Sequence, residues 1–196
     1  MAMTRLRTAT ALTAAALVLA GCSTGDDQPA ESAAPETTTT ETSEPTPGEG
    51  NFPTPEDADR SDVDSTAETA ALMLHSWDTT TDRTQTAAAV RAKPLMSEDW
   101  AANQVEPERN GAQGQWLEPA EHQAWSSPTL TQTAVPPQMT TGLDSRDDRA
   151  IRAYDVSWAW QGRDGELLRS DETSTIILFL ERHDGQWEVV GHDRPQ

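Results

Sequence analysis

The chain has 196 residues, and its 33 acidic residues outnumber its 14 basic residues, for a formal net charge of −19. A surface of that sign repels phosphate backbones, so the composition argues against nucleic-acid binding. The single cysteine excludes a disulfide within the chain, and a folded domain must therefore rely on its hydrophobic core.

The first residues have the order of an export signal. A basic start precedes an apolar stretch from Ala9 to Ala20, which is shorter than the roughly 20 residues that a membrane-spanning helix needs. The stretch runs into Leu19-Ala20-Gly21-Cys22, which resembles a bacterial lipobox. The resemblance implies that residues 1–21 form a lipoprotein signal peptide and that Cys22 carries the lipid. It places the protein on the extracytoplasmic face of the cell membrane, held there by its lipid.

The next segment, residues 22–65, consists largely of Thr, Ser, Pro, Glu and Asp with almost no large apolar side chain. Such a composition cannot bury enough apolar surface to offset the entropy of ordering the chain. We predict that residues 22–65 form a disordered acidic stalk. Residues 66–196 remain as one globular domain of ordinary size.

Three short helices are predicted at the start of this domain. The first begins at Ser65 or Thr66 and has apolar residues at helical spacing as far as Trp77. The second runs from Asp82 to the residue before Pro94, since the residue before a proline usually ends a helix. The third is capped by Ser97 and carries Trp100.

Strands are predicted in the second half of the domain. From Ala150 to Trp160 the side chains alternate, and Thr173 to Glu181 is the run with the highest β-propensity. Arg163-Asp164-Gly165 and Asp184-Gly185 supply tight turns, and a closing strand contains Trp187. Three consecutive strands joined by two Asp-Gly turns predict an antiparallel meander.

The segment between the helices and the meander, residues 106–141, has no single interpretation. Trp116 to Trp125 fits either a bent strand or a short helix, and Thr129 to Val135 fits an additional strand.

The predicted fold class is α+β, with N-terminal helices packed on a curved antiparallel sheet. Helices followed by a curled meander resemble the nuclear-transport-factor-two-like, or cystatin-like, cone. Trp77-Asp78, the segment Ala92–Ser97 and the segment Gly185–Val189 are similar to parts of actinobacterial envelope proteins of this fold, including periplasmic domains of conjugation and secretion accessory proteins. The resemblance implies a sheet that wraps around the helices and leaves a pocket, but it implies no activity.

No catalytic residue is predicted. Enzymes of the resembled fold place a carboxylate base and a hydrogen-bond-donating tyrosine or acid in the cone. The only tyrosine, Tyr154, lacks a matching motif and is assigned to the core or its rim. The four histidines lack metal-ligand spacing, and no cofactor-binding motif occurs, so no metal or cofactor is expected.

Seven tryptophans against two phenylalanines and one tyrosine make the aromatic content unusual. Core packing is the favoured interpretation, and the lining of a ligand pocket is the alternative. The candidates for either role are Trp77, Trp100, Tyr154, Trp158 and Trp160. Trp116 and Trp125, in the irregular segment, are candidates for exposed contacts with a partner.

The sequence therefore favours a membrane-anchored lipoprotein that displays a non-catalytic binding domain, with another envelope protein as its partner and an envelope complex as its setting. The alternative is a carrier of small apolar ligands, or an isomerase-like enzyme, that uses the cone pocket. A purely structural envelope protein is the third hypothesis. Dimerisation through the sheet is left open.

Overall fold

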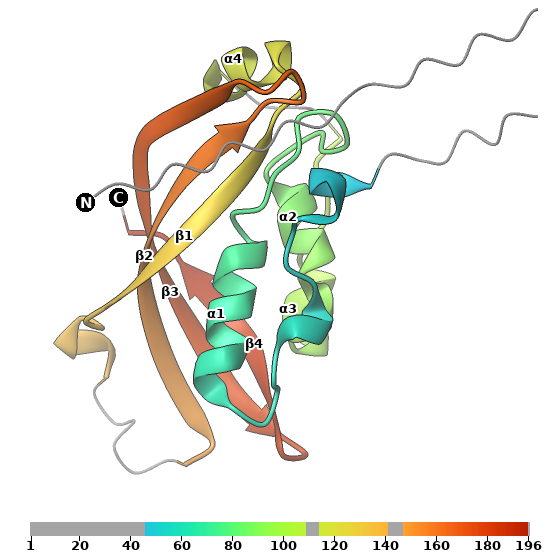
Figure 1. Ribbon diagram of the computed structural model, residues 1–196. Coiled ribbons are helices and arrows are strands. Elements are labelled where there is room, and N and C mark those ends of the chain that lie inside the picture. Colours follow the sequence, from blue (N-terminus) through green and yellow to red (C-terminus); the bar gives the residue numbers. More distant parts are fainter. Residues whose placement is uncertain (1–45, 109–113, 141–146, 196) are drawn as a thin grey trace, which may run out of the picture. The chain divides into compact units, whose positions relative to one another are not determined.

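A four-stranded antiparallel sheet organises the fold in the computed structural model, which describes residues 46–108, 114–140 and 147–195. The strands are β1 (Trp125–Thr133), β2 (Arg149–Gln161), β3 (Leu167–His183) and β4 (Gln186–Asp193), and each pairs with the next (Figure 1). The predicted meander is confirmed as β2, β3 and β4. The additional strand predicted at Thr129–Val135 is present as β1, which begins four residues earlier and ends two residues earlier.

Tight turns join the strands of the meander where the Asp-Gly pairs predicted them. Gly165 has a φ of 90°, and Asp184 and Gly185 have φ values of 50° and 82°. Two successive residues with positive φ form the hairpin turn whose twist matches that of the flanking strands. The β3–β4 connection therefore follows directly from its local sequence.

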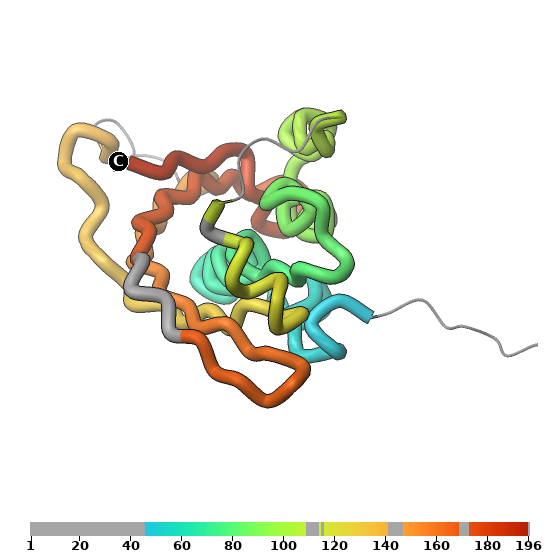
Figure 2. Tube along the Cα trace, turned by 90° about the horizontal axis from the view of Figure 1, so that it is seen from above, coloured from blue at the N-terminus to red at the C-terminus, as the bar shows by residue number. Residues whose placement is uncertain are grey.

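Helices pack against the concave face of the sheet, which curves around α1 (Figure 2). The α-helices are α1 (Val63–Met73), α2 (Thr86–Arg91), α3 (Glu98–Ala102) and α4 (Leu117–Glu121). The 3-10 helices are η1 (Pro47–Gly50), η2 (Pro55–Asp57), η3 (Lys93–Leu95), η4 (Gly114–Trp116) and η5 (Pro137–Met139). Ser97 caps α3 as predicted. The α+β class is confirmed, and no helix in the described ranges is long and apolar enough to cross a membrane.

Several helix boundaries differ from prediction, and α1 ends at Met73, four residues before Trp77. The side chain of Asp62 accepts a hydrogen bond from the amide of Ser65, so this residue caps α1 and starts the helix at Val63. The second helix begins at Thr86 rather than at Asp82, because Asp82 is buried and its carboxylate accepts a hydrogen bond from the amide of Asp78. Asp82 is thus part of a buried turn and does not start a helix.

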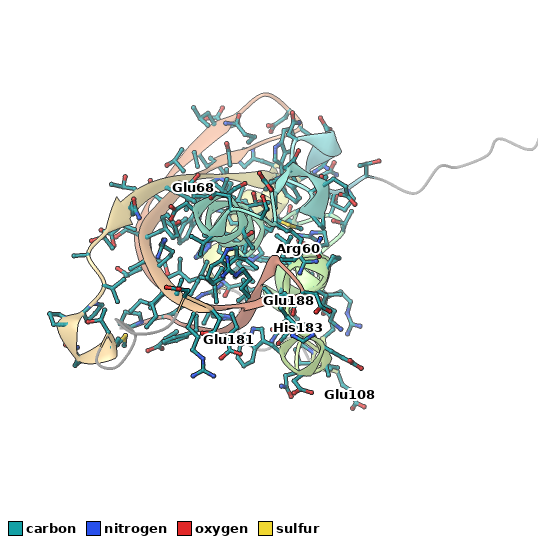
Figure 3. All side chains as sticks on the ribbon, turned by 90° about the horizontal axis from the view of Figure 1, so that it is seen from below. Arg60, Glu68, Glu108, Glu181, His183 and Glu188 are labelled. Carbon is teal, nitrogen blue, oxygen red and sulfur yellow. The ribbon has the colours of Figure 1, made fainter. Side chains whose placement is uncertain are left out.

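The folded unit begins earlier than the predicted boundary at residue 66. The amide of Gly48 donates to Oδ2 of Asp78 at 2.8 Å, and the amide of Trp187 donates to the carbonyl of Arg60 at 2.7 Å. Nη2 of Arg60 also lies 3.0 Å from Oε1 of Glu188 (Figure 3). Residues 46–62, assigned to the stalk by composition, therefore pack on the domain. The predicted signal peptide and the rest of the predicted stalk, residues 1–45, lie outside the described residues.

Each face of the sheet has its own apolar cluster. The larger cluster lies between the concave face and the helices and includes Trp77, Tyr154, Trp158 and Trp160. The smaller cluster, Ile151, Ala153 and Ile177, lies on the convex face and is covered by Val135, Met139 and Phe179. The connection after β1 therefore folds over the convex face of the sheet.

Packing of residues 46–52 can be tested with two glycines of positive φ. A Cβ at Gly48 (φ 59°) would lie 2.4 Å from the Phe52 ring, whereas a Cβ at Gly50 (φ 80°) meets nothing within 4 Å. We expect Gly50→Ala to lower the free energy of unfolding by about 1 kcal/mol, the usual strain of a left-handed alanine. Gly48→Ala should lower it by about 1 kcal/mol more, a further drop of roughly 2–4 °C in Tm. Equal Tm values for the two variants in thermal denaturation would show that the Phe52 ring does not pack against Gly48.

Candidate functional site

An open groove lies where the N-terminal segment, α1 and β1 meet, and we call it the Phe52–Trp125 groove. Its volume is about 340 Å³, near the lower end of the roughly 300–1,000 Å³ typical of ligand sites. It is lined by residues 51–53, Asp57, Leu72, Ser76 and residues 125–128. Asn51 and Ser127 on its margin are exposed, so the groove opens to solvent.

Two arginines fix the aromatic walls of the groove. Cζ of Arg91 lies 5.3 Å from the centre of the Phe52 ring, and Cζ of Arg163 lies 5.2 Å from the centre of the Trp125 ring. Such cation–π contacts contribute about 0.5–1 kcal/mol at exposed sites and more when desolvated. Both rings are thereby held by charges placed beside the groove.

Buried carboxylates hold these two arginines in turn. Nη2 of Arg163 donates to Oδ2 of Asp78 at 2.8 Å, and Nη2 of Arg91 donates to Oδ2 of Asp82 at 2.8 Å. Nη1 of each arginine makes a second bond to the same carboxylate, and Arg91 also donates to the carbonyl of Ser76 at 2.6 Å. Paired guanidinium and carboxylate groups with this geometry are strong and directional.

Asp78 has no exposed surface and is fully occupied by donors. Its carboxylate accepts from the amide and hydroxyl of Thr80 at 2.9 and 2.8 Å, in addition to Gly48 and Arg163. Burial alone would raise the pKa of Asp78, but these hydrogen bonds outweigh burial and hold the pKa below its usual value. The carboxylate is therefore an ionised structural group.

Ser126 fastens the start of β1 to the chain that follows α1. Its hydroxyl donates to the carbonyl of His75 at 2.7 Å and accepts from the amide of Trp77 at 2.7 Å. Its own amide donates to the carbonyl of Trp77 at 2.7 Å. This buried serine positions Trp125 and Ser127 on either side of it along the groove.

Four tryptophans fill the concave side of the sheet. Neighbouring ring centres of Trp77, Trp116, Trp158 and Trp160 lie 5.4–6.4 Å apart, and each residue is at most 9% exposed. Trp77, Trp158 and Trp160 are buried members of the larger apolar cluster. The four indole rings therefore contact one another in the interior of the domain.

The two tryptophans predicted to make exposed contacts, Trp116 and Trp125, differ in burial. Trp116 is only 4% exposed, so its predicted exposure is wrong. The turn formed by η4 and α4 places it on Trp77 and Trp160, a tertiary contact that composition does not reveal. Trp125 is half-buried and lines the groove. Trp100 is half-buried on α3, where its ring meets that of His192 at 5.5 Å.

His75 lies inside the tryptophan cluster and is 1% exposed. Its Nδ1 is 2.9 Å from the carbonyl of Ala71, and its Nε2 has no hydrogen-bond partner among the described residues. Burial lowers the pKa of His75 to about 4, and the positive charge of Arg194 adds to this effect. Arg194 donates to the carbonyl of Leu74 at 3.3 Å, so it compensates the carbonyl end of α1.

Tyr154 is also inside the core, 1% exposed, with no hydrogen-bond partner for its hydroxyl among the described residues. Burial raises the pKa of Tyr154 above its usual range, and the charges of Glu68 and Asp64 add to the rise. The Tyr154 hydroxyl is thus a very weak acid, and Tyr154 does not line the groove.

Polar clusters elsewhere are small. Nδ1 of His122 lies 2.7 Å from Oδ2 of Asp164, and this hydrogen bond raises the pKa of His122. The pair links the end of α4 to the β2–β3 turn. Within the described residues, no group of three or more His, Cys, Asp or Glu side chains is placed to hold a metal ion.

The groove residues were not found from the sequence, apart from Trp125. Phe52 was assigned to the stalk, and Ser126 and Pro128 carried no expected role. The one available signal was Phe52 itself, one of two phenylalanines in the chain and an exception in a segment almost without large apolar residues.

Comparison with known proteins yields no relative for this chain. No family model, curated protein or solved structure matches it.

The buried His75 predicts a pH-dependent stability. The unfolded chain titrates this histidine near 6.5 and the folded chain near 4, so the unfolded state binds more protons between these values. Stability is therefore full above pH 6.5 and falls as the pH falls towards 4. From pH 7.5 to pH 5 we expect a loss of about 2 kcal/mol in the free energy of unfolding, measured with urea.

His75→Phe should remove most of this pH dependence, and His192, whose pKa burial also lowers, should leave a smaller remainder. His183→Phe is the matched control, because His183 is 79% exposed in its side chain. An unchanged pH slope in the His75 variant would show that His75 is not buried as described.

Proposed function

We propose that the protein is an extracytoplasmic lipoprotein, anchored through Cys22, whose domain binds another envelope protein at the Phe52–Trp125 groove. The observation that carries this proposal is that buried ion pairs fix both aromatic walls while the space between the walls stays open. Pre-ordered aromatic side chains are what a binding surface needs, because little entropy is lost when a partner arrives.

The fold supports the same proposal. The curvature of the sheet around α1 is consistent with the nuclear-transport-factor-two-like, or cystatin-like, cone that the sequence resembles (Figure 2). In this protein, however, tryptophans pack against one another on the concave side, where a carrier or isomerase would hold its ligand. This packing favours a binding module over the carrier and enzyme alternatives.

The groove is also near the proposed anchor in the sequence. Among the described residues, those of η1 and the groove-lining residues 51–53 lie closest along the chain to Cys22. The proposed tether would therefore join the domain beside the groove.

The anchor can be tested by labelling cells with a clickable fatty-acid analogue. The full chain should incorporate the label, and Cys22→Ser should not, because Cys22 is the only thiol in the chain. A labelled serine variant, or an unlabelled parent chain, would overturn the lipoprotein assignment.

The binding role can be tested with a photo-cross-linking amino acid placed at Ser127 in the full chain, in the cells that make it. Light should join the groove position to a second protein. The same amino acid at Asp184, in the exposed β3–β4 turn, is the matched control and should give no adduct. Equal adducts at both positions, or none at Ser127, would contradict the assignment of the groove.

A further inference from the structure

The β1 strand has one edge that faces away from the rest of the sheet. The amide of Ser126 donates to the carbonyl of Trp77, which lies on the side opposite β2. In an antiparallel strand, the backbone groups of alternate residues point to the same side. Because β1 pairs with β2 in unbroken register, Pro128, Leu130 and Gln132 also direct their backbone groups away from β2.

This edge is open beyond Ser126. In the part of the chain that the structure describes, no other segment gives a backbone hydrogen bond to residues 128–133 from outside the β1–β2 pair. The opposite edge of the sheet is covered, because Val189 accepts from the amide of Ser97 at 3.0 Å and Trp187 donates to Arg60. An open strand edge is a template for pairing with another chain.

The groove lies directly beside the open edge. Pro128 is both the first outward-facing residue of that edge and part of the groove lining. Leu72 of α1 and Ser76, which follows α1, line the same groove. An added strand would lie about 4.8 Å from β1, so it would pass from the groove along the edge towards Gln132.

Negative charge borders this path. The groove lining contains one carboxylate, Asp57, and no lysine or arginine. Glu68 lies one turn before Leu72 on the same face of α1, where it is exposed (Figure 3). Its negative charge adds to the rise that burial causes in the pKa of Tyr154, the residue paired with Gln132.

The neighbouring basic groups do not offset these acids. Arg91 and Arg163 are neutralised by Asp82 and Asp78. Arg60, the only base between Glu56 and Asp64, is paired with Glu188. A partner strand with lysine or arginine side chains would therefore meet uncompensated carboxylates.

We propose that the segment bound at the groove is an extended, positively charged peptide that pairs with β1 as an added strand. The amides of Leu130 and Gln132 donate to its carbonyls, and the carbonyls of Pro128 and Leu130 accept from its amides. Its basic side chains lie near Asp57 and Glu68. This inference rests on the proposed function of the groove. A second copy of the chain is a poorer occupant, because it brings its own net charge of −19.

The test uses the isotope-labelled full chain in a non-ionic detergent and a short synthetic peptide of alternating lysine and valine. Amide hydrogen exchange at Leu130 and Gln132 should slow by about tenfold or more at millimolar peptide, and added salt should weaken the effect. A peptide of alternating glutamate and valine is the matched probe and should leave exchange unchanged.

Gln132→Pro supplies the matched variant. Gln132 is exposed, its amide faces away from β2, and a proline is tolerated at such an edge position, as Pro128 already shows. The variant should keep the Tm of the parent and bind the lysine peptide about tenfold more weakly. Asp57→Asn should also weaken binding of the lysine peptide. The asparagine carbonyl can still accept the hydrogen bond that the amide of Thr54 donates to Asp57, so the local turn is kept.

The outcomes separate this inference from the proposed function. Cross-linking at Ser127 without slowed exchange at Leu130 and Gln132 would keep the groove as a binding site and overturn strand addition. Equal effects of the two peptides, or undiminished binding by Gln132→Pro, would overturn it as well. If exchange at Leu130 and Gln132 slows as the protein concentration rises in the absence of peptide, the occupant of the edge is a second copy of the chain and the basic-peptide proposal is overturned.

Discussion

The buried carboxylate of Asp78 is the constraint on which the rest of the site depends. A buried carboxylate left without partners is strongly unfavourable, and breaking such a pair typically costs about 3–5 kcal/mol. Asp78 meets this requirement with Gly48 from the N-terminal segment, Thr80 from its own turn and Arg163 from the β2–β3 turn. These three segments are thereby brought to one point. The N-terminal segment belongs to the domain because its backbone completes this set of donors.

The same ion pairs link the stability of the domain to the geometry of the groove. Arg163 pairs with Asp78 and also lies over Trp125, while Arg91 pairs with Asp82 and lies over Phe52. Each guanidinium group donates two hydrogen bonds to a carboxylate and also lies over an aromatic ring, and lysine lacks the planar fork that makes the paired bonds. The ion pairs therefore hold the cations that contact the groove walls, and the groove itself is open to solvent.

Local signals made the sheet predictable, and distant contacts made the groove unpredictable. The meander followed from alternating apolar residues and from turns whose φ values Gly165 and Gly185 supply. Residues 46–62 pack on the domain through distant contacts: Gly48 and Asp78 are 30 residues apart, and Arg60 and Glu188 are 128 residues apart. Local composition carries no information on such contacts and therefore places these residues in the stalk. The groove combines three segments between residues 51 and 128, and no periodicity within one segment indicates it. Burial of Trp116 likewise depends on where α4 returns to the core.

The distribution of polar groups supports the proposed binding role. Among the described residues, His75 and Tyr154 are titratable, have unpartnered polar atoms and are each 1% exposed, but both lie outside the groove lining. The carboxylate of Asp78 is close to the groove but is already saturated by hydrogen bonds. What the groove presents instead is fixed aromatic surface, one acidic side chain and, beside it, an unpaired backbone edge. Backbone groups recognise an extended chain of almost any sequence, and the surrounding charge then selects which chains are accepted.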